Sequence, residues 1–225
     1  GTPKYGRGSR RCCLTGWNMV IYYYMAMSAQ SKQTGREVVN NMAFEKKIDG
    51  ETLYKGIIVD VSMDHAELIN GDIVRREVVH HPGGVTIIPV EEDGTVWCVR
   101  QFRYPMQREM LEVPAGKLEY GEKPLPAAER ELGEETGLTA GRMVYLGECC
   151  TSPGFSTEVL HIYLALELRR GEAHPDEDEF LNVEKHSLET LTDMVMAGEI
   201  DDAKTIIAVL KARRFLEAEG WREKF

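Results

Sequence analysis

The chain of 225 residues has little positive charge, few cysteines and no long hydrophobic run, and each shortage excludes a class of protein. Its 27 lysines and arginines are outnumbered by 37 acidic residues, which gives a net charge of −10. So acidic a protein is not built to coat nucleic acid or an anionic membrane. It can bind a phosphate-bearing molecule only through metal cations or through a few arginines focused in one pocket. We therefore expect a small-molecule partner, and neither nucleic acid nor a membrane.

The five cysteines do not form a recognisable framework. Their number is odd, no C-x-x-C occurs, and no spacing of cysteine and histidine suits zinc. Free thiols in a reducing compartment are the simplest interpretation, so we expect a cytoplasmic protein.

The N-terminal segment differs in composition from the rest of the chain. Residues 1–36 contain six basic side chains and no acidic one. The apolar run Trp17–Met27 covers 11 residues, whereas a membrane-spanning helix needs about 20. We interpret residues 1–42 as a poorly ordered leader or extension, with a natural start near Met25 or Met27. A functional targeting signal is the alternative.

The first half of the remaining chain has the alternation and turn residues of β-strands. Asn70-Gly71-Asp72 and Asp93-Gly94 are typical turn sequences, and the second predicts a hairpin. The strands expected around these two turns are Tyr54–Asp60, Ile73–Val79, Val85–Val90 and Val96–Phe102.

The second half mixes strands with three expected helices. Pro124 suits a first helical turn and Gly137 a helix end, so a helix is expected over Pro124–Thr136. Hydrophobic periodicity predicts the other elements: strands at 143–148 and 159–168, and helices at 187–197 and 203–218. Strands outnumber helices and are not joined by regular βαβ units. We therefore expect an α+β fold with a mixed sheet and helices on both faces.

One segment of the sequence places glycine, arginine and glutamate residues in a defined spacing. It reads G-x5-E-x7-R-E-U-x-E-E-x-G-U, where U is a bulky aliphatic residue, and its nine defined positions are Gly116, Glu122, Arg130, Glu131, Leu132, Glu134, Glu135, Gly137 and Leu138. On a helix, Glu131 and Glu135 lie four residues apart and share a face, and Arg130 and Glu134 form the adjacent pair.

The carboxylates of this segment are placed where a helix disfavours them. Glu131, Glu134 and Glu135 fall in the last turns of the expected helix, at the negative end of its dipole. Only Arg130 compensates them locally. The missing partner is most simply a hard divalent cation, because carboxylate oxygens suit Mg²⁺ or Mn²⁺. A solvated acidic helix face is the alternative, but it does not explain so many defined positions.

At these residues the chain resembles the Nudix hydrolases, and the signature of that family is complete. The resemblance implies a Nudix-type α/β/α sandwich that binds two or three Mg²⁺ or Mn²⁺ ions and cleaves a nucleoside diphosphate linked to another group. It implies Glu131, Glu135 and the backbone carbonyl of Ala115 as metal ligands. Glu134, as water partner or base, and Arg130, as orienting salt-bridge partner, are implied as catalytic, with Glu122 at the edge of the site.

The resemblance extends over roughly residues 45–215 and favours the ADP-ribose pyrophosphatase subgroup. Its markers outside the signature are 99–103, 111–116, Pro153 in the segment 151–156, Glu177–Phe180 and 200–205. In that subgroup a small N-terminal antiparallel sheet forms a homodimer, which implies a dimerisation element at residues 43–80 and a Nudix hydrolase domain at 81–225.

The chemistry of a diphosphate substrate and the resemblance to the subgroup together suggest where the substrate and the general base lie. Arg103, with Arg75 or Arg76, can donate to phosphate oxygens, and Glu112 matches a position that anchors substrate or metal. An ordinary basic strand edge is the alternative for Arg75 and Arg76. In the acidic loop Gly171–Glu179, Glu179 is the expected general base, with Glu177 next; a solvated surface loop is the alternative.

The expected activity is Mg²⁺-dependent hydrolysis of ADP-ribose to AMP and ribose 5-phosphate. Two alternatives stay open. One is a pyrophosphatase for another nucleoside diphosphate sugar, such as GDP-mannose or UDP-glucose. The other is a sensor that binds ADP-ribose without cleaving it; such proteins tend to lose signature glutamates, and none is missing here.

Overall fold

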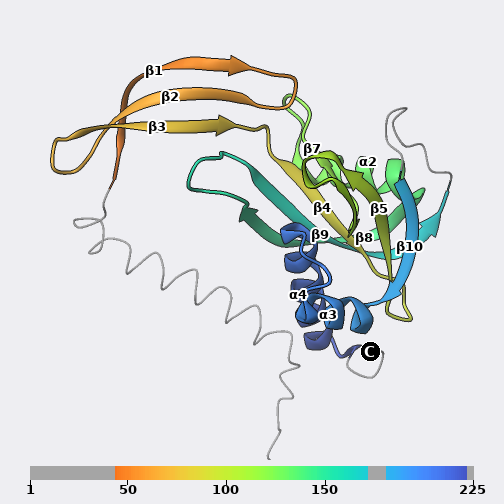
Figure 1. Ribbon diagram of the computed structural model, residues 1–225. Coiled ribbons are helices and arrows are strands. Elements are labelled where there is room, and N and C mark those ends of the chain that lie inside the picture. Colours follow the sequence, from red (N-terminus) through yellow and green to blue (C-terminus); the bar gives the residue numbers. More distant parts are fainter. Residues whose placement is uncertain (1–43, 172–180, 222–225) are drawn as a thin grey trace, which may run out of the picture. The chain divides into compact units, whose positions relative to one another are not determined.

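The computed structural model describes residues 44–171 and 181–221, so the expected leader at 1–42 and the expected base Glu179 lie outside the described residues. The elements within the described ranges are β1 (Lys46–Lys55), β2 (Asp60–Glu67), β3 (Ile73–His80), β4 (Gly84–Pro89), β5 (Thr95–Arg103), the 3-10 turn η2 (Tyr104–Met106), β6 (Arg108–Glu112), β7 (Ala115–Lys117), α2 (Pro124–Thr136), β8 (Leu138–Cys150), β9 (Val159–Arg170), β10 (Leu181–Ser187), α3 (Leu188–Ala197) and α4 (Ala203–Ala218) (Figure 1).

The described chain divides into two compact units, 44–46 with Glu67–Ile73, and Lys47–Ala66 with Val74 onward. The first contains the turn that leads from β2 to β3. Here the expected Asn70-Gly71-Asp72 turn is confirmed: Gly71 has a φ of +87°, and the Leu68 amide donates to the Asp72 carbonyl at 2.8 Å. In this left-handed conformation glycine is the residue without a steric penalty.

The N-terminal sheet has the strand order β1-β2-β3, and one of its strands was predicted wrongly. The range Tyr54–Asp60 is not one strand: it contains the end of β1, the turn at residues 56–59 and the first residue of β2. The Gly56 amide donates to the Val59 carbonyl at 3.0 Å and to Asp60 Oδ1 at 3.3 Å. Ile57, one of the apolar residues that suggested a strand, is fully exposed in this turn. The β-propensity of the apolar residues was outweighed by a turn that Gly56 and Asp60 stabilise.

Two further sheets form the rest of the fold. A mixed sheet has the order β7-β4-β9-β8, with β4 and β9 parallel, and an antiparallel sheet has the order β10-β5-β6. The hairpin expected around Asp93-Gly94 is therefore wrong beyond the turn: β4 and β5 share only the bridge between Val90 and Val96. The reason is that β4 is already paired on both sides, with β7 and β9, so no free edge remains for β5.

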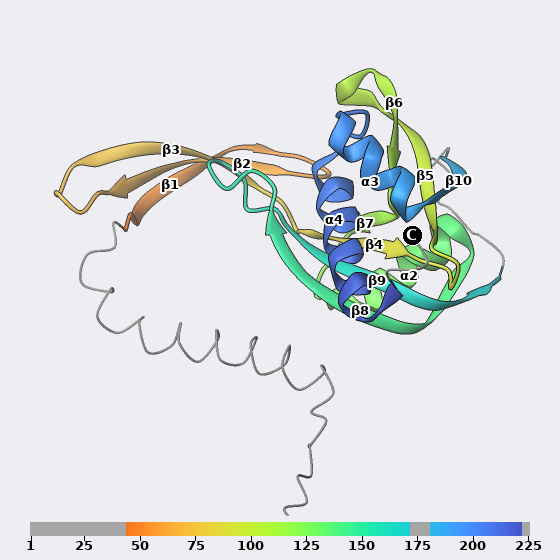
Figure 2. The same cartoon turned by 90° about the horizontal axis from the view of Figure 1, so that it is seen from below.

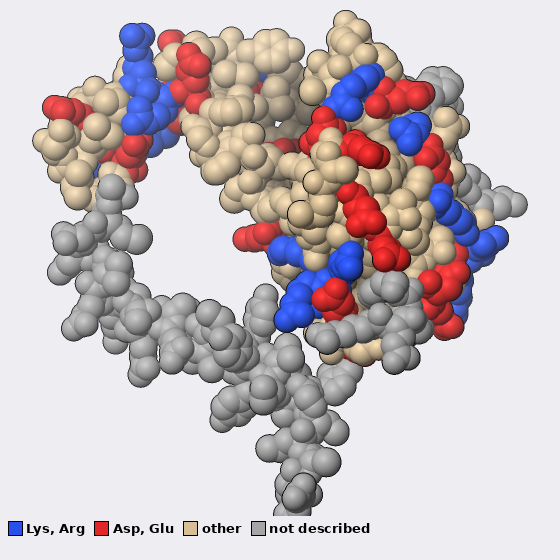
Figure 3. Space-filling model, turned by 60° about the horizontal axis from the view of Figure 1, so that its bottom comes forward, with Lys and Arg blue, Asp and Glu red and all other residues tan. Residues whose placement is uncertain are grey.

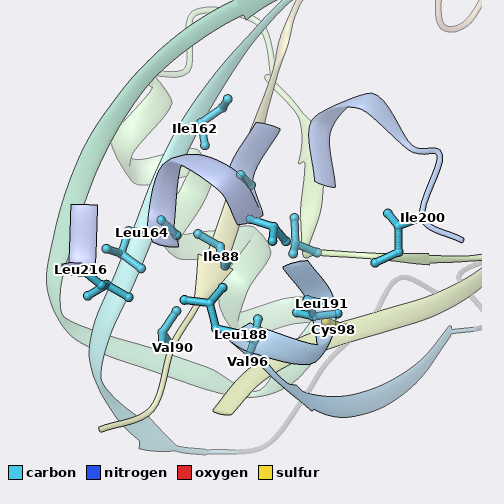
Figure 4. Packing of buried hydrophobic residues seen from close by; sticks show 14 of the residues in the cluster. Ile88, Val90, Val96, Cys98, Ile162, Leu164, Leu188, Leu191, Ile200 and Leu216 are labelled. Atoms are coloured by element: carbon cyan, nitrogen blue, oxygen red, sulfur yellow. The ribbon is translucent and has the colours of Figure 1, made fainter. Parts of the chain in front are cut away.

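The mixed sheet is covered on both faces, which confirms the expected layered α+β architecture. Side chains of β4 alternate between two buried clusters: Ile88 packs with residues of α3 and α4, and Ile87 with residues of α2. Figure 4 shows Ile88, Ile162 and Leu164 of the strands facing Leu188, Leu191 and Leu216 of the helices, and Figure 2 shows α3 beside α4.

Helix α2 has the bounds that the sequence predicts. Pro124 stands in its first turn, and Gly137 ends it with a φ of +68° and an amide that donates to the Gly133 carbonyl. Its buried face includes Ala127, Ala128 and Leu132, which pack on the mixed sheet. This packing turns the acidic positions of the last two turns toward β7. In residues 44–171 and 181–221, none of the helices combines the length and hydrophobicity that a membrane span requires.

Two glycines of α2 provide a matched stability test. Gly137→Ala places a side chain in the left-handed region and should lower the free energy of unfolding by about 1–2 kcal/mol. Gly133→Ala lies in the helix interior, where the nearest atom to an added Cβ is the Leu138 carbonyl oxygen at 3.9 Å. It should raise the free energy of unfolding by about 0.5–1 kcal/mol. Urea unfolding measures both, and equal effects of the two variants would contradict this assignment of the helix end.

Candidate active site

Arg130 is the centre of the acidic cluster at the end of α2. Its guanidinium donates to both oxygens of Glu122 at 3.0 Å, to Glu131 Oε1 and Glu134 Oε2 at 2.8 Å each, and to the Lys117 carbonyl at 3.3 Å. These five hydrogen bonds use all five N–H donors of an arginine. The expected pairing of Arg130 with Glu134 is present, and the same side chain also ties the helix to the preceding loop.

The Glu131 carboxylate fits into a space that Gly116 leaves open. A Cβ atom at position 116 would overlap the carboxylate carbon and both oxygens of Glu131. Glu131 itself is only 8% exposed. The signature glycine is therefore required by the close approach of this carboxylate to the backbone of β7.

Glu135 lies one turn further along the same face and is almost completely buried. Its Oε2 accepts a hydrogen bond from the Ala115 amide at 3.2 Å. Neighbouring backbone groups are fixed as well: the Pro114 carbonyl accepts from the Ile87 amide at 2.8 Å, and Ala115 pairs with Thr86 of β4. The structure thus brings Glu131, Glu135 and Ala115, the three expected metal ligands, to one place where α2 meets β7.

The charges of the cluster keep the edge carboxylate ionised. The hydrogen bonds from Arg130, helped by the Glu119 amide, hold the pKa of Glu122 below its usual range. Conversely, the hydrogen bond to Glu122, the charge of Glu131 and the hydrogen bonds to Glu134 and Glu131 together raise the pKa of Arg130 above its usual value. Four carboxylates and one guanidinium still leave an excess of negative charge, which attracts cations.

A second charged group lies on strands β5 and β6. Arg103 forms a two-pronged ion pair with Glu112, with Nε to Oε1 at 2.7 Å and Nη2 to Oε2 at 2.6 Å. Lys204, at the start of α4, donates to the same Glu112 and to Asp202 Oδ1, the latter at 3.0 Å. Glu112 is 1% exposed, whereas the Arg103 side chain is 38% exposed.

The pKa values of this ion pair reflect burial and close opposite charge. Burial alone would raise the pKa of Glu112, but Arg103 and Lys204 outweigh it and lower that pKa. The Glu112 hydrogen bond raises the pKa of Arg103, and the charges of Asp202 and Glu135 contribute in the same direction. Arg103 and Glu135 are linked through the chain, because Glu112, the partner of Arg103, stands three residues before Ala115, whose amide donates to Glu135.

Arg75 and Arg76 line a different groove, of about 530 Å³. Its other lining residues are Met63, Glu77, Gly154 and Phe155, none of which belongs to the acidic cluster. Phe155 is 57% exposed. The expected cooperation of Arg103 with Arg75 or Arg76 is thus not seen as a contact among the described side chains, and it stays a prediction.

The donor set at the end of α2 suits a hard divalent cation. All candidate ligands are oxygens, from two buried carboxylates and one carbonyl. Within residues 44–171 and 181–221, no three acidic, histidine or cysteine side chains converge to form a metal site by themselves. Glu131, Glu135 and Ala115 fit Mg²⁺, which is usually bound by one or two carboxylates and completes its shell with water and substrate phosphate.

Sequence reasoning missed the contribution of α4 to this neighbourhood. Lys204 contacts Glu112 and Thr205 contacts Val113, both at the end of β6 and nearly a hundred residues earlier in the chain. Asp202, which precedes α4, accepts hydrogen bonds from Lys204 and Thr205. The stretch 200–205 was noted only as a marker of the subgroup. No local pattern reveals that its lysine reaches Glu112, because that contact depends on how α4 packs on the sheet.

Comparisons of this chain with known proteins agree on one family. The NUDIX domain family matches residues 80–209. The "ADP-ribose pyrophosphatase" of Bacillus subtilis (strain 168) is 41% identical over 179 residues, which cover 78% of this chain and 97% of that protein. The "Methanol dehydrogenase activator" of Bacillus methanolicus is 41% identical over 73% of this chain and 90% of its own length.

More distant relatives and a solved structure extend the comparison. The "GDP-mannose pyrophosphatase" of Citrobacter koseri is 34% identical over 61% of this chain and 78% of its own length. A crystal structure titled "Crystal structure of ADP compounds hydrolase" superposes with a TM-score of 0.68, covering 78% of this chain and 96% of that one. At 24% sequence identity this superposition establishes the fold.

The space around Gly116 gives a direct test of the site. Gly116→Ala should displace the Glu131 carboxylate while leaving the fold intact, because the clash falls on the end of a flexible side chain. We expect the affinity for Mn²⁺, measured by titration calorimetry, to fall by at least about tenfold, as it does when groups that orient metal ligands are lost.

Gly133→Ala serves as the matched control. It adds the same methyl group to the same signature segment, but its Cβ has ordinary contacts. Its Mn²⁺ affinity should stay within about twofold of the parent protein, since no ligand or orienting group is displaced. Parental Mn²⁺ affinity in Gly116→Ala would show that the Glu131 carboxylate does not contribute to metal binding.

Proposed function

The chain belongs to the NUDIX domain family, and from this premise we propose that it hydrolyses the diphosphate bond of ADP-ribose to AMP and ribose 5-phosphate. The observation that carries the proposal is the complete signature, folded so that Glu131 and Glu135 meet the backbone of Ala115 and Gly116. The ADP-ribose pyrophosphatase from Bacillus subtilis, matched over almost its whole length, supports this choice of substrate.

Glu131, Glu135 and the Ala115 carbonyl would hold Mg²⁺ or Mn²⁺, with two or three ions per site. Such ions supply charge neutralisation for the diphosphate oxygens and lower the pKa of bound water. The protein's own contribution is to fix the ligands. Arg130 holds the Glu131 and Glu134 carboxylates in one orientation, and the Ala115 amide holds Glu135. Glu134, which is about one third exposed, can accept a hydrogen bond from water at the edge of the site.

Arg103 supplies positive charge for the substrate. Its contact with Glu112 uses two of its five N–H donors, so the outer edge of the guanidinium can bind phosphate oxygens as a planar fork. Glu112 is too deeply buried to meet a substrate directly in this arrangement. We therefore assign it the orientation of Arg103. Glu179, outside the described residues, stays our prediction for the base that deprotonates the attacking water.

A pyrophosphatase for GDP-mannose is the alternative, and the Citrobacter koseri relative is the observation that favours it. The signature fixes the cleavage of a diphosphate but leaves the attached group open. On the face drawn in Figure 3, acidic and basic side chains are interspersed over the described surface. The described part of that face therefore has no continuous basic surface along which a polyanion such as nucleic acid could bind. This agrees with a small nucleotide sugar as the partner.

We propose that the protein acts as a cytoplasmic homodimer through residues 43–80. Every residue of β1 is exposed, including Ile48, Leu53 and Tyr54. A three-stranded sheet with exposed apolar side chains is stabilised when another surface covers it.

The cytoplasm, as a reducing compartment, accords with Cys98, Cys149 and Cys150, which are all free thiols. Burial raises the pKa of the Cys98 thiol to about 12.

Turnover of a substrate panel tests the activity. With saturating Mg²⁺ and equal concentrations of ADP-ribose, GDP-mannose, UDP-glucose and NADH, we expect the highest kcat/KM on ADP-ribose, with AMP as a product. Glu135→Gln should lower kcat on ADP-ribose by at least about a hundredfold, because it removes a charged metal ligand and not only a supporting group.

Glu129→Gln is the control for this loss of charge. Glu129 lies on α2 but is exposed and is not part of the signature. Its kcat should stay near the parental value. A preference for GDP-mannose would select the alternative substrate, and binding of ADP-ribose without turnover would select a sensor.

The dimer is tested by charge substitution on β1. Ile48 and Leu53 are separated by an odd number of positions, so their side chains lie on opposite faces of the strand. We expect the parent protein to be dimeric by light scattering, and Ile48→Glu or Leu53→Glu, whichever faces the partner, to be monomeric. A monomeric parent, or dimers in both variants, would contradict the assignment of residues 43–80.

A further inference from the structure

Lys204 lies in the first turn of α4, where its ammonium group sits between two carboxylates. It donates to Glu112 Oε2 and, at 3.0 Å, to Asp202 Oδ1. Its side chain is 12% exposed, so most of its length is packed against the protein. A lysine is rarely so buried unless it is paired. Lys204 is therefore placed to form ion pairs within the protein and is not an ordinary solvent-exposed surface lysine.

Glu112 is the carboxylate that Lys204 and Arg103 share, and its burial makes neighbouring positive charge important. Glu112 is 1% exposed, and a buried carboxylate with one counter-charge removed is strongly unfavourable. If Arg103 were the only cation beside it, the guanidinium would have to satisfy the whole carboxylate. Lys204 contacts Oε2 from the side of α4, while Arg103 approaches both oxygens from β5. This division allows Arg103 to keep a planar two-pronged contact and to leave its remaining donors for a ligand.

The start of α4 is itself anchored to the strand that carries Glu112. Asp202 Oδ2 accepts from the Thr205 amide at 3.0 Å and from its hydroxyl at 2.6 Å. The Thr205 oxygen in turn accepts from the Val113 amide at 3.1 Å. Because Val113 directly follows Glu112, this hydrogen bond fixes the start of α4 next to the end of β6. The ammonium group of Lys204 therefore has a fixed place relative to the Glu112 carboxylate.

We propose that Lys204 is a positioning residue for substrate binding, which acts through Glu112 to present the Arg103 guanidinium to the diphosphate. The inference rests on the proposed function, since it takes Arg103 to be a phosphate donor. It assigns Lys204 no contact with the substrate and no part in the bond-breaking step. Its loss should therefore weaken substrate binding more than it slows the chemical step.

Lys204→Met tests the proposal, because methionine keeps the length of the side chain and removes its charge. We expect KM for ADP-ribose to rise about tenfold, within the range seen for coupled contacting residues, and kcat to change by less than about threefold. Lys204→Arg, which restores a cation, should bring KM back to within about threefold of the parent value. Mn²⁺ affinity should be unchanged in both variants.

Arg142→Met is the matched control for a loss of stability alone. Arg142 forms a comparable two-pronged ion pair with Glu219, at 3.1 and 2.9 Å, on β8 and at the end of α4. It contacts none of the residues assigned to the site in the described chain. Its Tm should fall as that of Lys204→Met does, while its KM stays at the parental value. A KM increase in Arg142→Met equal to that in Lys204→Met would mean that KM reports general destabilisation, and would overturn the proposal.

A double-variant cycle separates positioning from direct contact with the substrate. Glu112→Gln removes the charge through which Lys204 is proposed to act, and it also relieves the need for a counter-charge. In this background Lys204→Met should raise KM by less than about twofold, because coupled effects do not add. If Lys204→Met raised KM about tenfold in both backgrounds, Lys204 would bind the substrate itself and the positioning assignment would be wrong.

The same measurements distinguish this inference from the function on which it rests. If the parent protein did not hydrolyse ADP-ribose, the proposed function would fail. If it did, but Arg103→Gln left KM unchanged, Arg103 would not bind the substrate and the inference about Lys204 would fail with it. If Arg103→Gln raised KM for ADP-ribose and Lys204→Met did not, only the assignment of Lys204 would be overturned.

Discussion

The structure of the site depends on the pairing of one guanidinium with three glutamates, two on α2 and one in the loop before it. Arg130 donates to Glu122, Glu131 and Glu134, and the nearby Glu135 adds a fourth carboxylate. The negative end of the helix dipole makes this the least favourable part of the helix for such a group. The arrangement therefore lowers the stability of the helix. Divalent cations bound to the carboxylates would offset this cost. Since a lysine has only three donors and a point charge, it could not hold the same set.

The fold supplies rigid supports on each side of this cluster. Strand β4, completely buried, fixes the backbone from Pro114 to Lys117 through the Ile87 amide and the β7 ladder. From the opposite face of the sheet, the start of α4 fixes Val113 through Thr205. The short segment that carries Ala115 and Gly116 is thus held by α2, β4 and α4 together. Metal ligands and substrate-binding groups need such support to keep a productive geometry.

Elements defined by local chemistry could be predicted from the sequence. Pro124 and Gly137 set the bounds of α2, and Gly71 set a turn, because each acts through its own backbone. Pairings set by distant partners could not. The turn at Asp93-Gly94 suggested a hairpin, but β4 had better partners in β7 and β9, far along the chain. The apolar Ile57 and Ile58 suggested a strand and proved to be exposed turn residues.

The same distinction applies to the site residues. The spacing on one helix brought Glu131 and Glu135 to a common face, so their meeting with Ala115 could be expected. Lys204 is joined to Glu112 only by tertiary packing, and it was missed. The groove lined by Arg75 and Arg76 includes no residue of the acidic cluster, so a contribution of these arginines to substrate binding stays a prediction.

We propose above all that the carboxylates around Arg130 take up divalent cations, and that the protein uses these ions to cleave a diphosphate. Titration of the parent protein with Mn²⁺, followed by electron paramagnetic resonance, measures this uptake most directly. We expect saturable binding of Mn²⁺ below millimolar concentrations, which Mg²⁺ competes away and ADP-ribose strengthens. The absence of bound Mn²⁺ at millimolar concentrations, with the protein folded, would contradict it.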